Sequence, residues 1–398
     1  MTSASIPSKL YYPEFDRRWL RHSLYDLAVW INGMAFKDIN FATFGTPVIK
    51  IAEIKNGVSG QTRFTQEKYD QKYFLDNGDL LFCWSGQPET SIDTYWWRGG
   101  DGWLNQHIFK VLPKQEVADR GFFYQLLRYM RSTFVQIARN KQTIGLGHVT
   151  KTDLQRLVVA LPPLDEQRAI AAMLGSLDDK IESNRRLVDL IPRLIRAMVF
   201  DALGAHPVEV AVSDIATFVN GGAYTKGASG TGRIVIRIAE LNSGPGGSTV
   251  YSDIDVPEEK TARAGDILMS WSGSLGLYRW FRDEAIVNQH IFKVLPSDGY
   301  PSWLVFDRLD TVMPVFQGIA KDKATTMGHI QRGHLESTTV EIPTRETVDL
   351  LDGLIAPLWQ RLLLAEREVI ELTALRDALL PEVLSGRIRV LEADGAVA

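Results

Sequence analysis

The stretch Asn105–Pro113 reads NQHIFKVLP, and the same nine residues return unchanged at Asn288–Pro296. Two further stretches recur in the same order: VIKIAEIKNG at Val48–Gly57 as VIRIAELNSG at Val235–Gly244, and GDLLFCWSG at Gly78–Gly86 as GDILMSWSG at Gly265–Gly273. The copies lie 183 to 187 residues apart, whereas solenoid repeats have periods of roughly 20–50 residues. The sequence therefore predicts that one domain occurs twice in this chain.

Each copy is predicted to be rich in β-strands. The Asn-Gly pairs at Asn32-Gly33 and Asn220-Gly221 are typical of tight turns between strands. Runs of β-branched apolar residues, such as VIKI and VIRI, are typical of the strands themselves. Helical patterns come only late in each copy. We therefore expect an α+β fold with two similar β-rich domains, at residues 1–163 and 205–343.

A helical pattern of a different kind follows each copy, at residues 164–204 and 344–398, the latter including a C-terminal tail. Apolar residues are spaced alternately four and three apart, which is the heptad pattern of a helix pair. Two such helices in one chain predict an antiparallel coiled coil with pseudo-two-fold symmetry. The predicted helix-pair interface comprises Leu174, Leu177, Ile181, Asn184, Val188, Ile191, Ile355, Leu358, Leu362, Ala365, Val369 and Leu372.

Two polar residues interrupt this interface. Arg376 occupies a position where the heptad pattern asks for an apolar residue. Asn184 either fixes the register of the helices, as a polar interface residue does in coiled coils, or lies at a half-hydrated rim. The sequence leaves both interpretations open.

The composition limits the class of protein. The net charge of −4 and the pI of about 6.0 argue against binding nucleic acid through bulk charge, although the distribution of charge matters more than its sum. Each copy has a basic strip, at Arg131–Lys151 and around Lys321. The single cysteine, Cys83, excludes an internal disulfide and favours a reducing compartment. With no secretory signal and no apolar run of membrane-spanning length, we expect a cytoplasmic protein.

Sequence motifs for catalysis are not found. One cysteine and seven scattered histidines form no zinc-binding pattern, and there is no P-loop or Gly-rich loop for S-adenosylmethionine. An acidic triplet suited to magnesium, Glu53-Ile54-Lys55, becomes Glu240-Leu241-Asn242 in the second copy and loses its lysine. We therefore expect a chain that is not an enzyme and that holds no metal and no cofactor of its own.

The segment TIGLGHVTKTDLQRLVVALPPLDEQRAI at Thr143–Ile170, followed by the heptad pattern, resembles the specificity subunits of Type I restriction–modification systems. The most specific local match is Pro162–Gln167, PPLDEQ, whereas the second copy reads IPTRET at Ile342–Thr347. The resemblance spans nearly the whole chain, since those proteins also have two target-recognition domains, each followed by a helix.

The resemblance implies a subunit that recognises double-stranded DNA and directs the chemistry of others. Each β-rich domain would read one half-site, and the helices would set the length of the spacer between half-sites. Two modification (methyltransferase) subunits would bring S-adenosylmethionine, and a restriction and translocase subunit would bring ATP and magnesium. Because the two domains are alike, we expect similar half-sites in inverted orientation.

Candidate DNA contacts follow from the residue types whose donors and acceptors match base edges or phosphates. Two loops differ between the copies, Gln87–Gly102 and Ser274–Asp283, and variation beside a fixed frame is expected of a specificity loop. The polar triplets that precede the identical strands either brace the fold or touch DNA. The full set of candidates is Gln87, Tyr95, Arg98, Asn105, Gln106, His107, Lys141, Gln142, Thr143, His148, Arg279, Asn288, Gln289, His290, Lys321, Lys323 and His329.

Two other classes of function are alternatives to this interpretation. One is an enzyme that modifies nucleic acid by itself, which the lack of cofactor and metal motifs opposes. The other is a scaffold whose two domains bind proteins. Incubating the pure chain with DNA, S-adenosylmethionine and magnesium distinguishes the first, and a DNA-binding assay distinguishes the second.

Overall fold

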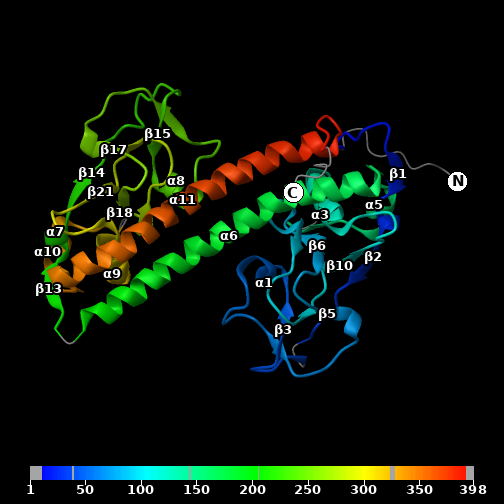
Figure 1. The fold of residues 1–398 in the computed structure, drawn as a ribbon, viewed down its shortest axis with the longest axis horizontal. Coiled ribbons are helices and arrows are strands. Elements are labelled where there is room, and N and C mark those ends of the chain that lie inside the picture. The colour runs from blue at the N-terminus through cyan, green and yellow to red at the C-terminus, as the bar shows by residue number, and fades with distance from the viewer. Residues whose placement is uncertain (1–10, 38–39, 143–144, 205, 323–327, 391–398) are drawn as a thin grey trace, which may run out of the picture. The chain divides into compact units, whose positions relative to one another are not determined.

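The computed structural model describes residues 11–37, 40–142, 145–204, 206–322 and 328–390 (Figure 1). The chain forms two compact units. Unit 1 comprises residues 1–179 and 373–398, and unit 2 comprises residues 180–372. Each unit contains one β-rich domain and one part of each of the two long helices, so the sequence of unit 2 is inserted into that of unit 1.

In the described residues, the β-rich domain of unit 1 contains two four-stranded sheets and two two-stranded sheets. The first sheet is antiparallel and has the order β2 (Ala28–Asn32), β10 (Ile108–Pro113), β6 (Leu80–Cys83), β8 (Asp93–Trp96). The second has the order β4 (Phe64–Thr65), β3 (Thr46–Ile49), β9 (Gly102–Leu104), β5 (Phe74–Leu75), with β3 and β9 parallel. Strands β1 (Leu20–Ser23) and β12 (Val158–Leu161) form the third, and β7 (Ser85–Gly86) and β11 (Gly147–His148) form the fourth.

The β-rich domain of unit 2 repeats the first three of these sheets strand for strand, and a single bridge between Ser272 and His329 stands in place of the fourth. Its first sheet has the order β14 (Ala216–Asn220), β21 (Ile291–Pro296), β18 (Ile267–Ser270), β19 (Gly276–Arg279). Its second has the order β16 (Val250–Ser252), β15 (Arg233–Ile236), β20 (Ala285–Val287), β17 (Thr261–Ala262), and β13 (Val208–Ala211) pairs with β22 (Thr339–Ile342). The predicted duplication and the α+β fold class are therefore confirmed.

Short helices complete each domain. Unit 1 has α1 (Ile51–Asn56), α2 (Pro88–Ser91), α3 (Arg120–Tyr129), α4 (Arg131–Asn140), α5 (Lys151–Arg156) and 3-10 turns at Tyr25–Leu27 and Gln71–Tyr73. Unit 2 has α7 (Val212–Ile215), α8 (Ile238–Ser243), α9 (Ser302–Asp322), α10 (Arg332–Ser337) and a 3-10 turn at Glu258–Lys260. A single helix, α9, thus stands where unit 1 has α3 and α4. The apolar faces of these helices pack on the first sheet of each domain to form its main core.

The lysine of the identical strand explains part of its identity. Lys110 Nζ lies 2.8 Å from the carboxylate of Asp79 and donates to the carbonyl of Phe74, which belongs to the second sheet. Lys293 makes the same two contacts, at 2.9 Å to Asp266 and 2.6 Å to the carbonyl of Thr261. A mostly buried ammonium group needs such partners, and here they tie the two sheets of each domain together.

The long helices α6 (Leu164–Leu203) and α11 (Arg345–Leu384) have 40 residues each and pack antiparallel within each unit. In unit 1, Ile170 and Leu174 of α6 share a core with Leu380, Val383 and Leu384 of α11. In unit 2, the cluster joins later residues of α6 with earlier ones of α11: Ile191, Ile195, Val199, Val348, Ile355, Trp359 and Leu362. The predicted antiparallel pairing is therefore confirmed in both units.

None of the predicted interface residues is exposed. Seven are buried (Leu174, Ile181, Asn184, Ile191, Ile355, Leu362 and Ala365), and Leu177, Val188, Leu358, Val369 and Leu372 are partly buried.

Asn184 has 0% exposure, so the rim interpretation is wrong. Its amide donates to Glu368 at 2.7 Å and accepts from Arg361 at 2.8 Å, both on α11. Burial opposes ionisation of Glu368, but the hydrogen bonds from Asn184 and Lys180 outweigh it and keep the pKa of Glu368 below its usual value. Each hydrogen-bonding group of the Asn184 amide thus meets a partner on the facing helix.

Arg376 departs from the heptad pattern because it pairs with a carboxylate on the facing helix. Its guanidinium lies 2.9 Å from Asp178 of α6, and both side chains are largely buried. Asp178 also accepts from Gln125 at 2.7 Å and from Arg128 at 3.2 Å, both on α3. The carboxylate therefore joins the helix pair to the β-rich domain of unit 1.

Candidate nucleic-acid interface

A half-buried tryptophan in unit 1 lies beside polar residues from three other segments. Trp84 follows β6, and its indole N–H donates to the side chain of Asn32 at 2.9 Å. Its ring lies 5.3 Å from that of His107 and 5.7 Å from that of Phe109. His148 lies beside it, because β11 (Gly147–His148) pairs with β7 (Ser85–Gly86). We call these five residues, Asn32, Trp84, His107, Phe109 and His148, the first tryptophan cluster.

Unit 2 builds the same arrangement from the second copy of the sequence. The indole of Trp271 donates to Asn220 at 2.9 Å, and its ring lies 5.2 Å from His290 and 5.6 Å from Phe292. The backbone of His329 bridges to Ser272, the residue after this tryptophan. These five residues, Asn220, Trp271, His290, Phe292 and His329, form the second tryptophan cluster. The three corresponding distances agree within 0.1 Å between the units.

The central histidine of each cluster has an uncommon backbone conformation. His107 has a φ of 76° and His290 a φ of 74°, the left-handed region that few residues other than glycine adopt. In each case the carbonyl of the histidine accepts from the backbone N–H of the tryptophan at 3.1 Å. Such local strain persists only where the surroundings fix it. The strain and the rings beside it hold each imidazole at a defined place on the surface.

Partial burial lowers the pKa of His107 below its usual value of 6.5. The imidazole is therefore mainly neutral at pH 7, with one nitrogen that donates and one that accepts a hydrogen bond. A neutral imidazole suits the donor and acceptor groups of base edges better than it suits the negative charge of a phosphate.

A glycine sets the position of the second histidine in each unit. A Cβ atom on Gly147 would lie 2.2 Å from the carbonyl oxygen of Ala138, and one on Gly328 would lie 2.0 Å from that of Ala320. No side chain fits at such a distance. The Gly-His pairs at Gly147-His148 and Gly328-His329 therefore combine a close backbone approach to the preceding helix with a histidine beside the tryptophan.

The polar triplets divide between fold and surface. Asn105 donates its backbone N–H to the carbonyl of Ile49 at 3.1 Å, and the side chain of Asn288 accepts from the backbone of Tyr224 at 3.1 Å. The side chain of Asn288 thus braces the fold, whereas Gln106 and Gln289 are exposed next to the tryptophan clusters. The two glutamines are thus the members of the triplets with side chains free to reach a ligand.

The predicted specificity loops contain regular structure. The first loop contains α2 and the edge strand β8, and the second contains the edge strand β19. Gln87 is exposed just before α2, and Tyr95 lies on β8, partly buried against the core between the two sheets. Arg98 is exposed and lies 3.5 Å from Asp179 of α6. The long helix α6 thus positions Arg98, and the core between the two sheets positions Tyr95.

Arg279 is held by contacts inside unit 2. Its guanidinium donates to the buried carboxylate of Glu366 on α11 at 2.6 Å and lies over the rings of Phe306 and Trp359. Only 12% of its side chain is exposed. These contacts fasten strand β19 to the long helix within unit 2.

The basic strips differ in the freedom of their lysines. Lys141 pairs with Asp153 at 2.5 Å, and Asp153 also caps α5. Gln142 is exposed and donates to the carbonyl of Gly145 at 2.8 Å. Lys321 is exposed near the end of α9. Thr143 and Lys323 lie outside the described residues.

The acidic triplets have a structural role as helix caps. The carboxylate of Glu53 accepts from the backbone of Lys50 at 3.0 Å and from Thr62 at 3.1 Å, and Glu240 accepts from Arg237 and Thr249 at the same two distances. Within the described ranges, no group of three or more His, Cys, Asp or Glu residues could hold a metal ion. A search of the same residues finds no helix that could span a membrane.

Sequence reasoning missed Asn32 and Asn220 as members of the clusters, because it assigned them only to turns. Their recurrence beside a glycine in both copies was visible. What the sequence could not provide was the hydrogen bond to a tryptophan about fifty residues further along the chain.

Comparisons with known proteins agree with this architecture. The family model described as "Type I restriction modification DNA specificity domain" matches residues 18–193. The EcoBI specificity subunit of a Type I restriction enzyme from Escherichia coli is 27% identical over 180 residues, which cover 45% of this chain and 36% of that protein. The MjaVIII specificity subunit of Methanocaldococcus jannaschii is 24% identical over 130 residues, 33% of this chain and 29% of that protein. The chain thus spans about a third of the length of these curated relatives.

The fold has a solved counterpart. The crystal structure of the S subunit of a Type I restriction–modification system from M. genitalium has a TM-score of 0.62 at 14% sequence identity, and the match covers 94% of this chain and 99% of that one. Residues 18–193 thus resemble the DNA specificity domain that the family model describes. The resemblance to the specificity subunits of Type I restriction–modification systems, which the sequence predicted, is confirmed.

Proposed function

We propose that this chain is a DNA-recognition subunit that performs no catalysis itself. Each β-rich domain reads one half-site of a bipartite sequence in double-stranded DNA. The observation that carries this proposal is the tryptophan cluster, which the chain builds twice with matching distances. A twofold duplicated surface of aromatic rings, imidazole and exposed glutamine supports a target that also has two parts.

Reading is assigned to the side chains next to each cluster. Gln106 and Gln289 are exposed amides of the kind that pairs with adenine in the major groove. Lys321 and its neighbours would contact phosphates, which position the protein without carrying sequence information. Because the two clusters are alike, the half-sites are expected to be similar and inverted, with an unread spacer between them.

The chemistry is assigned to other polypeptides. Two modification subunits would supply S-adenosylmethionine and methylate the DNA, and a restriction and translocase subunit would supply ATP hydrolysis and cleavage with magnesium. The helix pair of α6 and α11 would set the length of the spacer, since its register is fixed by buried polar contacts such as those of Asn184. The two predicted β-rich domains and two helical segments serve these separate roles.

The test is sequencing of methylated bases after reaction of this chain with its modification subunit. Gln106→Ala should relax the preference at one position of one half-site by about 1–3 kcal/mol, and Gln289→Ala should do so in the other half-site. Gln360→Ala, an exposed glutamine on α11, is the matched control and should leave both half-sites unchanged. Two glutamine variants with unaltered methylation patterns contradict the assignment of reading to these residues.

The assignment of catalysis is tested separately. The purified chain, incubated with DNA, S-adenosylmethionine and magnesium, should yield neither methylated nor cleaved product. A product that persists through further purification would contradict the proposal.

A further inference from the structure

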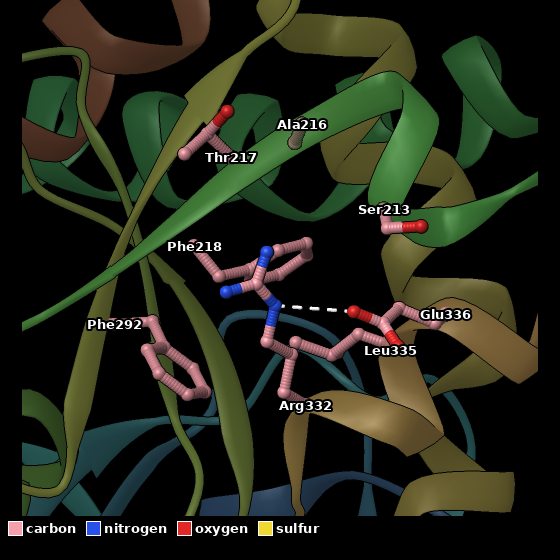
Figure 2. Close-up of a pocket in the computed structure, with 8 residues that line it drawn as sticks. All are labelled: Ser213, Ala216, Thr217, Phe218, Phe292, Arg332, Leu335 and Glu336. Atoms are coloured by element: carbon pink, nitrogen blue, oxygen red, sulfur yellow. Dashed lines mark hydrogen bonds and ion pairs between the residues drawn. The ribbon is translucent and has the colours of Figure 1, made fainter.

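Unit 2 has a hollow of about 230 Å³. It lies between α7, β14 and α10, and it is lined by Ser213, Phe218, Phe292, Arg332, Leu335 and Glu336, among others. Figure 2 shows the guanidinium of Arg332 extending across this space toward the ring of Phe218, with Ser213 on the other side. Arg332 also pairs with Glu336 at 3.1 Å.

In unit 1 the corresponding space holds an aromatic ring of the chain itself. Tyr25 stands where unit 2 has Ser213, and its ring stacks on that of Trp30 at 6.4 Å with an angle of 10° between the planes. Lys151, on α5, places its ammonium group 5.0 Å from the centre of the Tyr25 ring. The phenol ring of Tyr25 thus lies between the indole ring of Trp30 and the ammonium group of Lys151.

The two places correspond in backbone register. Trp30 faces Val111 across the sheet in unit 1, and Phe218 faces Val294 in unit 2. Just before Tyr25, the backbone N–H of Leu24 donates at 2.8 Å to the carbonyl of the residue that follows α5. Just before Ser213, the backbone N–H of Val212 donates at 2.9 Å to the carbonyl of the residue that follows α10. Unit 2 therefore keeps the aromatic base in Phe218 and the cation in Arg332, but Ser213 provides no ring between them.

We propose that the hollow of unit 2 receives a tyrosine side chain of a partner polypeptide. The ring would stack on Phe218 and lie under Arg332, as that of Tyr25 lies between Trp30 and Lys151. Aromatic pairs and cation–π contacts of this kind each contribute about 0.5–1.5 kcal/mol. The hydroxyl of Ser213 and the carboxylate of Glu336 are acceptors for the phenol O–H. A ring buried in a pocket is also the usual form of an anchor residue at a protein interface.

The charges at the hollow favour a neutral ring over a nucleotide. Arg332 pairs with Glu336 at 3.1 Å, so a carboxylate that repels a phosphate stands beside the cation. The lining also contains the apolar side chains of Phe218, Phe292 and Leu335. The proposal does not depend on DNA recognition, since the hollow is defined by side chains of unit 2 alone.

The experiment measures binding of small probes to the full chain by saturation-transfer NMR. The probes are the capped tripeptide Gly-Tyr-Gly, its Gly-Leu-Gly counterpart and adenosine monophosphate. We expect the tyrosine peptide to bind with a Kd on the order of 1 mM, as befits so small a ligand, and the other two to bind at least about tenfold more weakly, a difference of about 1.4 kcal/mol.

Variants that give each unit the other unit's residue at this position sharpen the test. Ser213→Tyr should fill the hollow from within and abolish binding, while its melting temperature stays equal to or above that of the wild type. Tyr25→Ser should open a second hollow in unit 1 and raise the number of bound peptides from one to two. If Ser213→Tyr does not fold, Phe218→Leu replaces it, and it should weaken binding of the tyrosine peptide by removing the stacking surface.

Three outcomes would overturn the proposal. They are equal binding of the leucine peptide, unchanged binding by Ser213→Tyr or Phe218→Leu, and binding of adenosine monophosphate in preference to the tyrosine peptide. The last would assign the hollow to a nucleobase instead of a polypeptide. If this chain with its modification subunit shows no sequence-specific methylation but still binds the tyrosine peptide, the proposed function is contradicted and this proposal stands.

Discussion

The β-rich domains of units 1 and 2 share a frame and differ at its edges. Strand order, the lysine that joins the two sheets and the tryptophan cluster are the same in both. The differences lie at Tyr25 and Ser213, and at the edge strands, where Arg279 of β19 pairs with α11 through Glu366. A duplicated domain thus keeps its internal braces while its outer contacts diverge, so equivalent substitutions in the two units separate frame from function.

The largest expected effect concerns the frame. Gly147→Ala and Gly328→Ala would each place a Cβ atom within about 2 Å of a backbone carbonyl, so the chain must shift, and we expect each to lower the free energy of unfolding by about 2–4 kcal/mol. Gly318→Ala is the control, because open space surrounds this exposed helical glycine, and it should stabilise by about 0.5–1 kcal/mol. Denaturant unfolding measures all three. A tolerated alanine at only one of the two sites would break the equivalence of the units.

The second effect concerns the helix pair, where the two copies of the heptad pattern differ. Arg376→Leu restores an apolar residue but leaves Asp178, largely buried, with only Arg128 and Gln125 among its described partners. We expect a loss of about 2–3 kcal/mol in the free energy of unfolding, less than for a fully orphaned charge. Arg193→Leu removes an exposed pair with Asp189 and should cost less than about 1 kcal/mol. Equal effects of the two variants would show that the buried pair has no special role.

The third effect distinguishes the two basic strips. Lys321→Ala removes an exposed cation, so the slope of log affinity for DNA against log salt should fall by about one unit with unchanged stability. Lys141→Ala should instead destabilise unit 1, because Asp153 is mostly buried and loses its ion pair. Burial opposes ionisation of Asp153, but hydrogen bonds from Lys141 and Thr150 hold its pKa below the usual value, so this stability is present at neutral pH and is lost as the pH falls. Salt titrations and thermal melts at pH 7 and pH 3 measure both.

The smallest effect is the titration of the cluster in unit 1. Because burial lowers the pKa of His107, the folded state binds fewer protons than the unfolded state just below pH 6.5. The contribution of His107 to stability is therefore present above pH 6.5 and is lost as the pH falls through the folded-state pKa. Trp84→Ala should expose the imidazole and move its pKa toward 6.5 in an NMR titration. A pKa that does not respond to this change would contradict the shielding of His107 by Trp84.

The duplication, the β-rich character and the antiparallel helices could be predicted from the sequence, because each produces a repeated stretch or a regular spacing of apolar residues. The edge strands could not, since β8 and β19 gain their structure by pairing with β6 and β18, and their residues read as irregular loops. Arg376 looked like an exception because its partner, Asp178, is 198 residues away. Among the candidate DNA contacts, pattern alone could not separate exposed glutamines such as Gln106 from Arg279, whose partner Glu366 lies on a distant helix.

The insertion of unit 2 into the sequence of unit 1 fixes an order of synthesis. The ribosome completes unit 2 when residue 372 has emerged, whereas the core of unit 1 requires Leu380, Val383 and Leu384. Ile170 and Leu174 must therefore wait for their partners through the translation of about 200 further residues, on the order of 10–40 s at typical elongation rates. During that interval the nascent N-terminal half presents an unfinished apolar surface at Ile170 and Leu174, which chaperones could cover.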